Sequence, residues 1–192
     1  MQKRLFIVHG WGGNSNQPML KQLEEMGNTL GFETTVVDMP HADVPTIDSW
    51  IKHLDSVVMY PDENTYFVGH SLGCQAILRY IQSAESPQTG GVICIAPAFF
   101  IADLETAEDK DIARPWIDNP INFPHLKKVI LESVGIFSDN DLTTPLIQNE
   151  EIFRKLSDKI IIEQSKGHFT QEDGVVDLPS ACSELERMSK NP

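Results

Sequence analysis

The chain has 192 residues, of which 41% are hydrophobic and 22% charged, and its formal net charge is −13. This length suits one domain over residues 1–192, and the negative charge disfavours nucleic acids and anionic membranes as partners, because both carry phosphate groups. No apolar run reaches the roughly 20 residues that span a membrane, and no cleavage site follows the short apolar stretch near the first residue, so we expect a cytoplasmic protein.

Strand-like apolar runs alternate with amphipathic segments of helical length along the whole chain. Such alternation predicts a parallel sheet covered on both faces, and right-handed crossovers favour a doubly wound three-layer α/β sandwich of about six strands. In chain order we expect strands at 3–9, 33–38, 65–69, 91–96, 133–138 and 159–163, and helices at 17–30, 46–58, 72–84, 101–112, 124–132, 147–157 and 177–188.

The first predicted strand runs into a glycine-rich turn, His-Gly-Trp-Gly-Gly at residues 9–13. Glycines let the backbone approach a ligand closely. The turn lacks both the Lys-Ser/Thr of a P-loop and G-x-G-x-x-G spacing, so it is a weak signal for nucleotide binding. In a hydrolase, a loop in this position supplies one backbone donor to the oxyanion, and here we expect that donor to be the N–H of Trp11.

The segment Gly-His-Ser-Leu-Gly at residues 69–73 lies between a predicted strand and a predicted helix. This is the arrangement of a nucleophile elbow, in which a strained turn exposes Ser71 and the flanking glycines supply room. The N–H groups at the start of the helix favour negative charge, so the N–H of Leu72 is the second candidate oxyanion donor. The five-residue pattern alone fits an ordinary turn with a solvated serine equally well, and the serine therefore needs partners.

Among the six histidines, His168 is the candidate general base. It follows the last predicted strand on a short loop, which brings it to the sheet edge where Ser71 lies. His70 adjoins Ser71 on the turn, so we expect its side chain to point elsewhere.

The turn after the predicted strand at 133–138 offers two carboxylates, Asp139 and Asp141, to orient that histidine. Aspartates also stabilise turns by accepting local N–H groups, so we expect one of the two to serve the turn and the other the reaction. The order Ser71, Asp141, His168 matches the chain order of α/β hydrolases.

The long connection between residues 97 and 125 carries Phe99, Phe100, Trp116 and Phe123. It leaves the carboxyl end of a predicted strand, where open α/β sheets bind ligands. We expect at least one of these aromatic side chains to line a pocket. The alternative is that they only pack this insertion onto the body of the domain.

With these residues assigned, the chain resembles the small α/β hydrolases related to retinoblastoma-binding protein 9 and YdeN over nearly its whole length. The resemblance implies a minimal α/β-hydrolase fold with strand order 2-1-3-4-5-6 and serine hydrolase chemistry on ester or amide bonds. It favours Asp141 over Asp139, because the family's acid stands four residues before the turn proline, here Pro145. The shared features are the glycine-rich first loop, Met39-Pro40 ahead of a helix with Trp50, Gly69–Ser71, Arg114–Trp116, the turn at 138–145 and Gly167–Phe169.

We therefore expect a carboxylesterase-type serine hydrolase that cleaves a small carboxylic ester or related acyl substrate through an acyl-enzyme on Ser71. His168 is the expected base, Asp141 the orienting acid, and Trp11 and Leu72 the oxyanion donors. Two alternatives are an amide or peptide hydrolase that uses the same residues and a non-catalytic protein-binding module on a hydrolase scaffold.

The expected reaction needs no metal or organic cofactor. The three cysteines (Cys74, Cys94 and Cys182) are odd in number and lack the spacing of metal ligands. Cys94 lies in an apolar run, which indicates a buried free thiol. A reducing cytoplasm fits this usage best.

Overall fold

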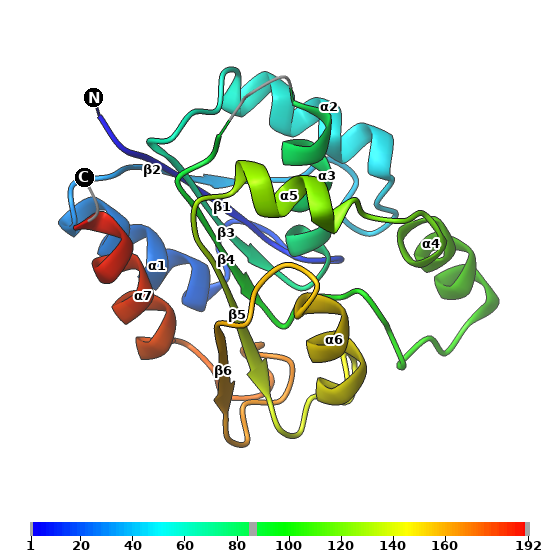
Figure 1. The fold of residues 1–192 in the computed structure, drawn as a ribbon. Coiled ribbons are helices and arrows are strands. Elements are labelled where there is room, and N and C mark those ends of the chain that lie inside the picture. Colours follow the sequence, from blue (N-terminus) through cyan, green and yellow to red (C-terminus); the bar gives the residue numbers. More distant parts are fainter. Residues whose placement is uncertain (1, 85–87, 191–192) are drawn as a thin grey trace.

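The computed structural model describes residues 2–84 and 88–190 (Figure 1). Six strands form one parallel sheet in the order β2-β1-β3-β4-β5-β6, which confirms the expected order. The strands are β1 (Arg4–Val8), β2 (Glu33–Val37), β3 (Thr65–His70), β4 (Gly91–Ile95), β5 (Ser133–Ser138) and β6 (Ile160–Glu163). The helices are α1 (Pro18–Thr29), α2 (Ile47–Val58), α3 (Leu72–Ser83), α4 (Ala107–Asp118), α5 (Phe123–Val129), α6 (Leu146–Phe153) and α7 (Pro179–Ser189).

Helices cover both faces of the sheet, so the molecule has three layers. Figure 1 shows α1 and α7 together on one side and α2, α3 and α5 on the other. Successive strand residues point to opposite faces. Ile7 and Val68 accordingly pack with α1 and α7, whereas Val8, Phe67 and Val92 pack with the other helices. Burial on both faces explains why the inner strands β1, β3, β4 and β5 are rich in apolar residues, whereas the edge strand β2 is more polar and more exposed.

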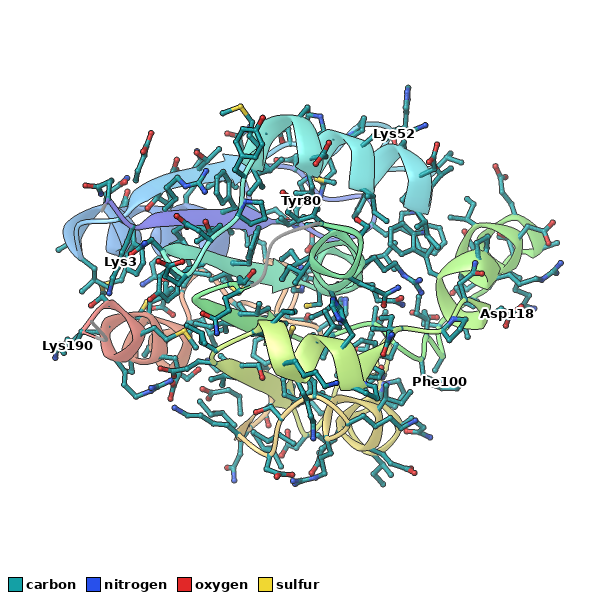
Figure 2. The ribbon with its side chains drawn as sticks, turned by 45° about the horizontal axis from the view of Figure 1, so that its top comes forward. Lys3, Lys52, Tyr80, Phe100, Asp118 and Lys190 are labelled. Atoms are coloured by element: carbon teal, nitrogen blue, oxygen red, sulfur yellow. The ribbon has the colours of Figure 1, made fainter. Side chains whose placement is uncertain are left out.

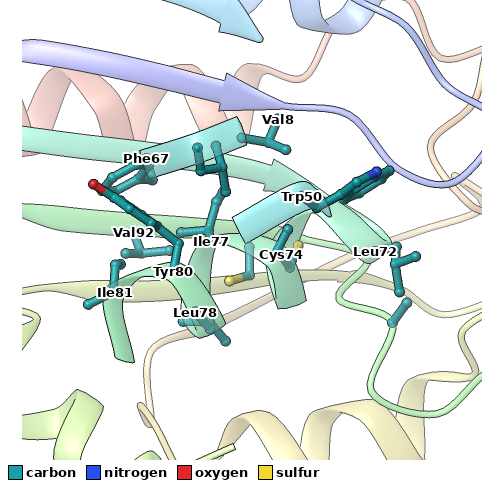
Figure 3. Packing of buried hydrophobic residues seen from close by; sticks show 14 of the residues in the cluster. Val8, Trp50, Phe67, Leu72, Cys74, Ile77, Leu78, Tyr80, Ile81 and Val92 are labelled. Carbon is teal, nitrogen blue, oxygen red and sulfur yellow. The ribbon is translucent and has the colours of Figure 1, made fainter. Parts of the chain in front are cut away.

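Helix α3 lies against the centre of the sheet, and every residue from Leu72 to Ile81 is buried. Figure 3 shows Ile77 and Tyr80 of this helix beside Phe67 of β3, and the ring centroids of Phe67 and Tyr80 are 6.1 Å apart. Because α3 begins directly after Ser71, this packing also fixes the position of the turn that carries the serine.

The helix expected at residues 101–112 is wrong in its position, since α4 spans Ala107–Asp118. A capping box sets its start: the Thr106 hydroxyl accepts the Asp109 N–H at 3.0 Å, and the Asp109 carboxylate accepts the Thr106 N–H at 3.0 Å. The preceding chain is drawn into a contact with another loop, because the Ala102 N–H donates to the Thr143 carbonyl at 2.9 Å. The other expected elements differ from the observed ones only at their ends.

All three cysteines are buried free thiols, as the apolar surroundings of Cys94 indicate. Within residues 2–84 and 88–190, no helix combines the length and apolarity needed to cross a bilayer.

Candidate active site

Ser71 lies in the tight turn between β3 and α3 with φ 53° and ψ −121°. A positive φ is uncommon for a residue other than glycine and marks a strained backbone that its surroundings must hold in place. Here the Ser71 N–H donates to the Ile95 carbonyl at 2.9 Å, and the Ser71 carbonyl accepts the Ala98 N–H at 3.3 Å. The neighbouring strand and the loop that follows it therefore hold the serine in its strained turn.

Glycines make the turn possible because three segments meet there without room for a side chain. A Cβ at Gly73 would lie 2.4 Å from the His9 carbonyl oxygen, and one at Gly69 would lie 2.7 Å from the Cys74 nitrogen. A Cβ at Gly10 would lie 2.8 Å from the Ser71 Cβ. The glycine-rich loop after β1 is thus packed directly against the serine.

The structure brings Ser71, His168 and Asp141 together into one hydrogen-bonded chain. The His168 Nε2 lies 2.9 Å from the Ser71 Oγ, and the His168 Nδ1 lies 2.9 Å from the Asp141 Oδ2. The three residues come from the ends of three different strands, β3, β5 and β6, at the carboxyl edge of the sheet. This is the edge at which the sequence places them.

The Asp141 carboxylate is buried and held on all sides by donors. Its Oδ1 accepts the Thr143 and Thr144 N–H groups at 2.9 and 2.8 Å, and its Oδ2 accepts the Thr144 hydroxyl at 2.7 Å. Burial alone would raise the pKa of Asp141, but the hydrogen bonds from His168 and Thr144 outweigh it and hold the pKa below its ordinary value. The ionised carboxylate only accepts, so the His168 Nδ1 carries the proton and its Nε2 is free to accept from Ser71.

Asp139 stands two residues earlier and has a different task. Its Oδ1 accepts the Ser165 N–H at 2.7 Å, and its own N–H donates to the Glu163 carbonyl at 3.1 Å. It therefore ties the loop after β6 to the loop after β5. The next residue extends this connection, since the Asn140 Oδ1 accepts the Gly167 N–H at 2.8 Å.

His70 is a contact of the site that sequence reasoning missed. Within the described residues its ring makes no hydrogen bond with the Ser71 hydroxyl, and its Nε2 lies 2.8 Å from the His168 carbonyl oxygen. A carbonyl only accepts, so the His70 Nε2 donates and holds the backbone of the candidate base. Burial, together with the neighbouring His168 ring, lowers the pKa of His70 from 6.5 to about 3. No sequence signal indicates this contact, because its acceptor is a backbone carbonyl, a group that every residue carries.

We expect His70 to make the folded protein acid-sensitive. The unfolded chain takes up a proton at His70 near pH 6.5, whereas the folded protein keeps it neutral down to about pH 3. The unfolded state thus binds more protons in this window, so the free energy of unfolding decreases by up to about 1.4 kcal/mol for each unit by which the pH is lowered. The variant His70→Gln retains an N–H donor but cannot titrate. Urea unfolding at several pH values should show a shallower pH slope for the variant, and identical slopes would contradict this role.

His9 fixes the glycine-rich loop against the segment after β2. Its Nε2 accepts the Met39 N–H at 2.9 Å, and its Nδ1 donates to the Gly10 carbonyl at 2.8 Å. Burial lowers the pKa of His9, which favours this neutral form. The Gly12 N–H in turn donates to the Ala42 carbonyl at 2.8 Å.

The two expected oxyanion donors flank the serine. Leu72 is the first residue of α3, and the N–H groups of the first helical turn have no intrahelical acceptor. Trp11 follows Gly10, and its indole N–H is already used by the Asp43 carbonyl at 2.9 Å. In the described part of the chain neither backbone N–H has a hydrogen-bond partner, so both are available to a ligand at Ser71.

The aromatic connection at 97–125 both packs the core and lines a cavity. Phe99, Trp116 and Phe123 border a cavity of about 600 Å³, which confirms that aromatic residues of this insertion line a pocket. Trp116 is also packed edge-on against Trp50, with ring centroids 5.5 Å apart. Phe100 does not border this cavity and is 39% exposed.

Among the described residues, no cluster of three or more His, Cys, Asp or Glu side chains could hold a metal ion.

Comparison with known proteins yields a consistent set of relatives. The family model described as "Serine hydrolase" matches residues 5–187. YdeN of Bacillus subtilis is 28% identical over 184 residues, which cover 93% of this chain and 92% of YdeN. Serine hydrolase RBBP9 of Rattus norvegicus is 26% identical over 167 residues, which cover 84% of this chain and 79% of RBBP9.

Solved structures share the fold over nearly the whole chain. The crystal structure of the B. subtilis ydeN gene product superposes with a TM-score of 0.88 and 22% identity, covering 99% of this chain and 100% of that one. Est1E from Butyrivibrio proteoclasticus, in a structure with ferulic acid bound, superposes with a TM-score of 0.75 and 15% identity, covering 97% and 88%.

Proposed function

The chain belongs to the serine hydrolase family, and from this premise we propose that it is a carboxylesterase-type enzyme acting through an acyl-enzyme on Ser71. The observation that carries the proposal is the continuous hydrogen-bonded chain from Asp141 through His168 to Ser71, with both links at 2.9 Å. A serine hydroxyl is a weak nucleophile, and this chain gives it a base that is already oriented.

In the proposed reaction, the His168 Nε2 takes the Ser71 proton while the Oγ forms a bond to the ester carbonyl carbon. Asp141 stabilises the positive imidazolium, and the N–H groups of Trp11 and Leu72 hold the oxyanion. As the intermediate collapses, the carbon–oxygen bond to the alcohol breaks and His168 returns its proton to that alcohol. Water then gives a proton to His168 while its oxygen bonds to the acyl carbon. As this second intermediate collapses, the bond between that carbon and the Ser71 Oγ breaks and His168 returns the proton to Oγ, which releases the acid and restores the Ser71 hydroxyl.

Small esters are the proposed substrates. Est1E shares the fold and is known with ferulic acid bound, so esters of aromatic acids are the natural first compounds to assay. The buried free thiols support a reducing compartment such as the cytoplasm as the place of the reaction.

An acyl-enzyme can be tested by partitioning, whichever step limits the rate. Esters of one acid with different alcohols are hydrolysed in the presence of added methanol, and the ratio of methyl ester to free acid is measured. A common acyl-enzyme predicts the same ratio for every alcohol, because the alcohol has left before methanol and water compete. A ratio that changes with the alcohol would contradict an acyl-enzyme. The anilide of the same acid is the matched substrate, and its faster turnover would assign the enzyme to amide hydrolysis.

A further inference from the structure

One cavity combines apolar walls with positive charge. It has a volume of about 600 Å³, within the usual range for small-molecule sites, and is lined from α3, the end of α4, α5 and the end of α6. Figure 2 shows these four helices grouped on the side of the molecule where Phe100 and Asp118 are labelled. Phe99, Trp116 and Phe123 form apolar parts of its wall, and neither Ser71 nor His168 lines it.

The charge of this cavity is opposite to that of the protein. The chain has 28 acidic and 15 basic residues, yet the charged residues that line the cavity are Arg79, Lys127 and Lys155, all of them basic. A second cavity of about 500 Å³ between the start of α2 and α4 is lined instead by Glu108 and Asp111. The first cavity is therefore a local positive site on an acidic protein.

Arg79 is the buried charge of the cavity, with 6% of its surface exposed. Its Nε and Nη2 donate to the Gln75 side-chain oxygen at 3.2 and 3.0 Å, and its Nη2 also donates to the Trp116 and Asn119 carbonyls at 2.9 and 2.7 Å. All these acceptors are neutral. Arg79 forms no ion pair within the described segments, so its charge is solvated by dipoles without a counter-ion.

The Nη1 of Arg79 has no hydrogen-bond partner among the described residues, and this atom is not fully buried. Arg79 also borders another cavity, but that one is lined by Asp48. The carboxylate of Asp48 makes that cavity less suited to an anion, although Asp48 pairs with Lys52 at 2.8 Å. The acid-free cavity is thus the place where an anion can meet the guanidinium.

We propose that this cavity binds an amphipathic monocarboxylate, with its carboxylate on Arg79 and its aromatic or branched apolar body against Phe99, Trp116 and Phe123. A carboxylate accepts strong charge-assisted hydrogen bonds from a guanidinium and neutralises a buried charge. Lys127 and Lys155 add attraction at the wall. The inference depends on Arg79 and its surroundings, and it holds whether or not Ser71 acts as an esterase nucleophile.

The proposal is tested with 2-naphthoate and its neutral counterpart 2-naphthalenemethanol, titrated into the isotopically labelled full chain and followed by NMR. We expect naphthoate to bind at least 10-fold more tightly than the alcohol and to shift the signals of Phe99, Ile121 and Phe123. Equal affinities, or shifts confined to residues around Ser71, would overturn the assignment.

Two matched variants test the charge without disturbing Arg79, which holds the end of α4 and is a poor target for mutation. Ile117 lines the cavity and is 37% exposed, so it tolerates a polar replacement. Ile117→Asp places a carboxylate in the cavity and should weaken naphthoate binding at least 10-fold. Ile117→Asn has the same shape without the charge and should change it less than about 3-fold. Similar affinities for the two variants would contradict recognition by charge.

Discussion

Replacing Ser71 by alanine should lower kcat for a short-chain p-nitrophenyl ester by about 10⁶-fold and abolish labelling by a fluorophosphonate. The substitution removes only the hydroxyl that lies 2.9 Å from the His168 Nε2. It keeps the Cβ that packs near Gly10, and alanine meets the same strain at a φ of 53°. The melting temperature should therefore stay within a few degrees of the original, which identifies the loss as chemical.

Ser83 is the matched control for Ser71, because it lies at the far end of α3 and its hydroxyl donates, among the residues that the structure describes, only to the Tyr80 carbonyl at 2.9 Å. Ser83→Ala should retain labelling and turnover. Undiminished labelling of Ser71→Ala would remove Ser71 from the mechanism. A folded wild-type protein that neither reacts with the probe nor hydrolyses esters would favour the binding-module alternative.

Replacing Asp141 by asparagine should lower kcat by about 10⁴-fold with little change in fold. The asparagine oxygen can still accept the Thr143 and Thr144 N–H groups, so its amide nitrogen faces His168. That nitrogen donates, and the His168 Nδ1 must then accept and give up its proton. The proton moves to Nε2, which can no longer accept from Ser71.

Asp139→Asn is the matched control, two residues away in the same turn. The asparagine oxygen can replace the carboxylate oxygen that accepts the Ser165 N–H, so kcat should fall by less than about 10-fold. Both variants are compared by steady-state kinetics on the same ester. A larger loss for Asp139→Asn than for Asp141→Asn would show that the acid is assigned to the wrong residue.

The local signals in the sequence were sufficient to predict the strands of the sheet and the turn that carries Ser71. Burial on both faces of a parallel sheet favours consecutive apolar residues, such as Tyr66–Val68 within β3, and these are visible without coordinates. The glycines at 69 and 73 reflect close contacts with the backbone, which no other residue type permits. The start of α4 was not visible in the same way, because a contact between Ala102 and Thr143 competes with helix formation before Thr106.

The sequence by itself determined that Ser71 and His168 would lie at one edge, since the carboxyl ends of parallel strands meet there. Only the tertiary structure shows that Asp141 contacts His168 while Asp139 contacts the Ser165 N–H, because two carboxylates of one turn have the same local chemistry and differ in where the turn aims them. Only the tertiary structure likewise shows the hydrogen bond from His70 to the His168 carbonyl and the positively charged cavity around Arg79. These contacts join residues far apart in the chain, and their geometry depends on how whole helices and loops pack.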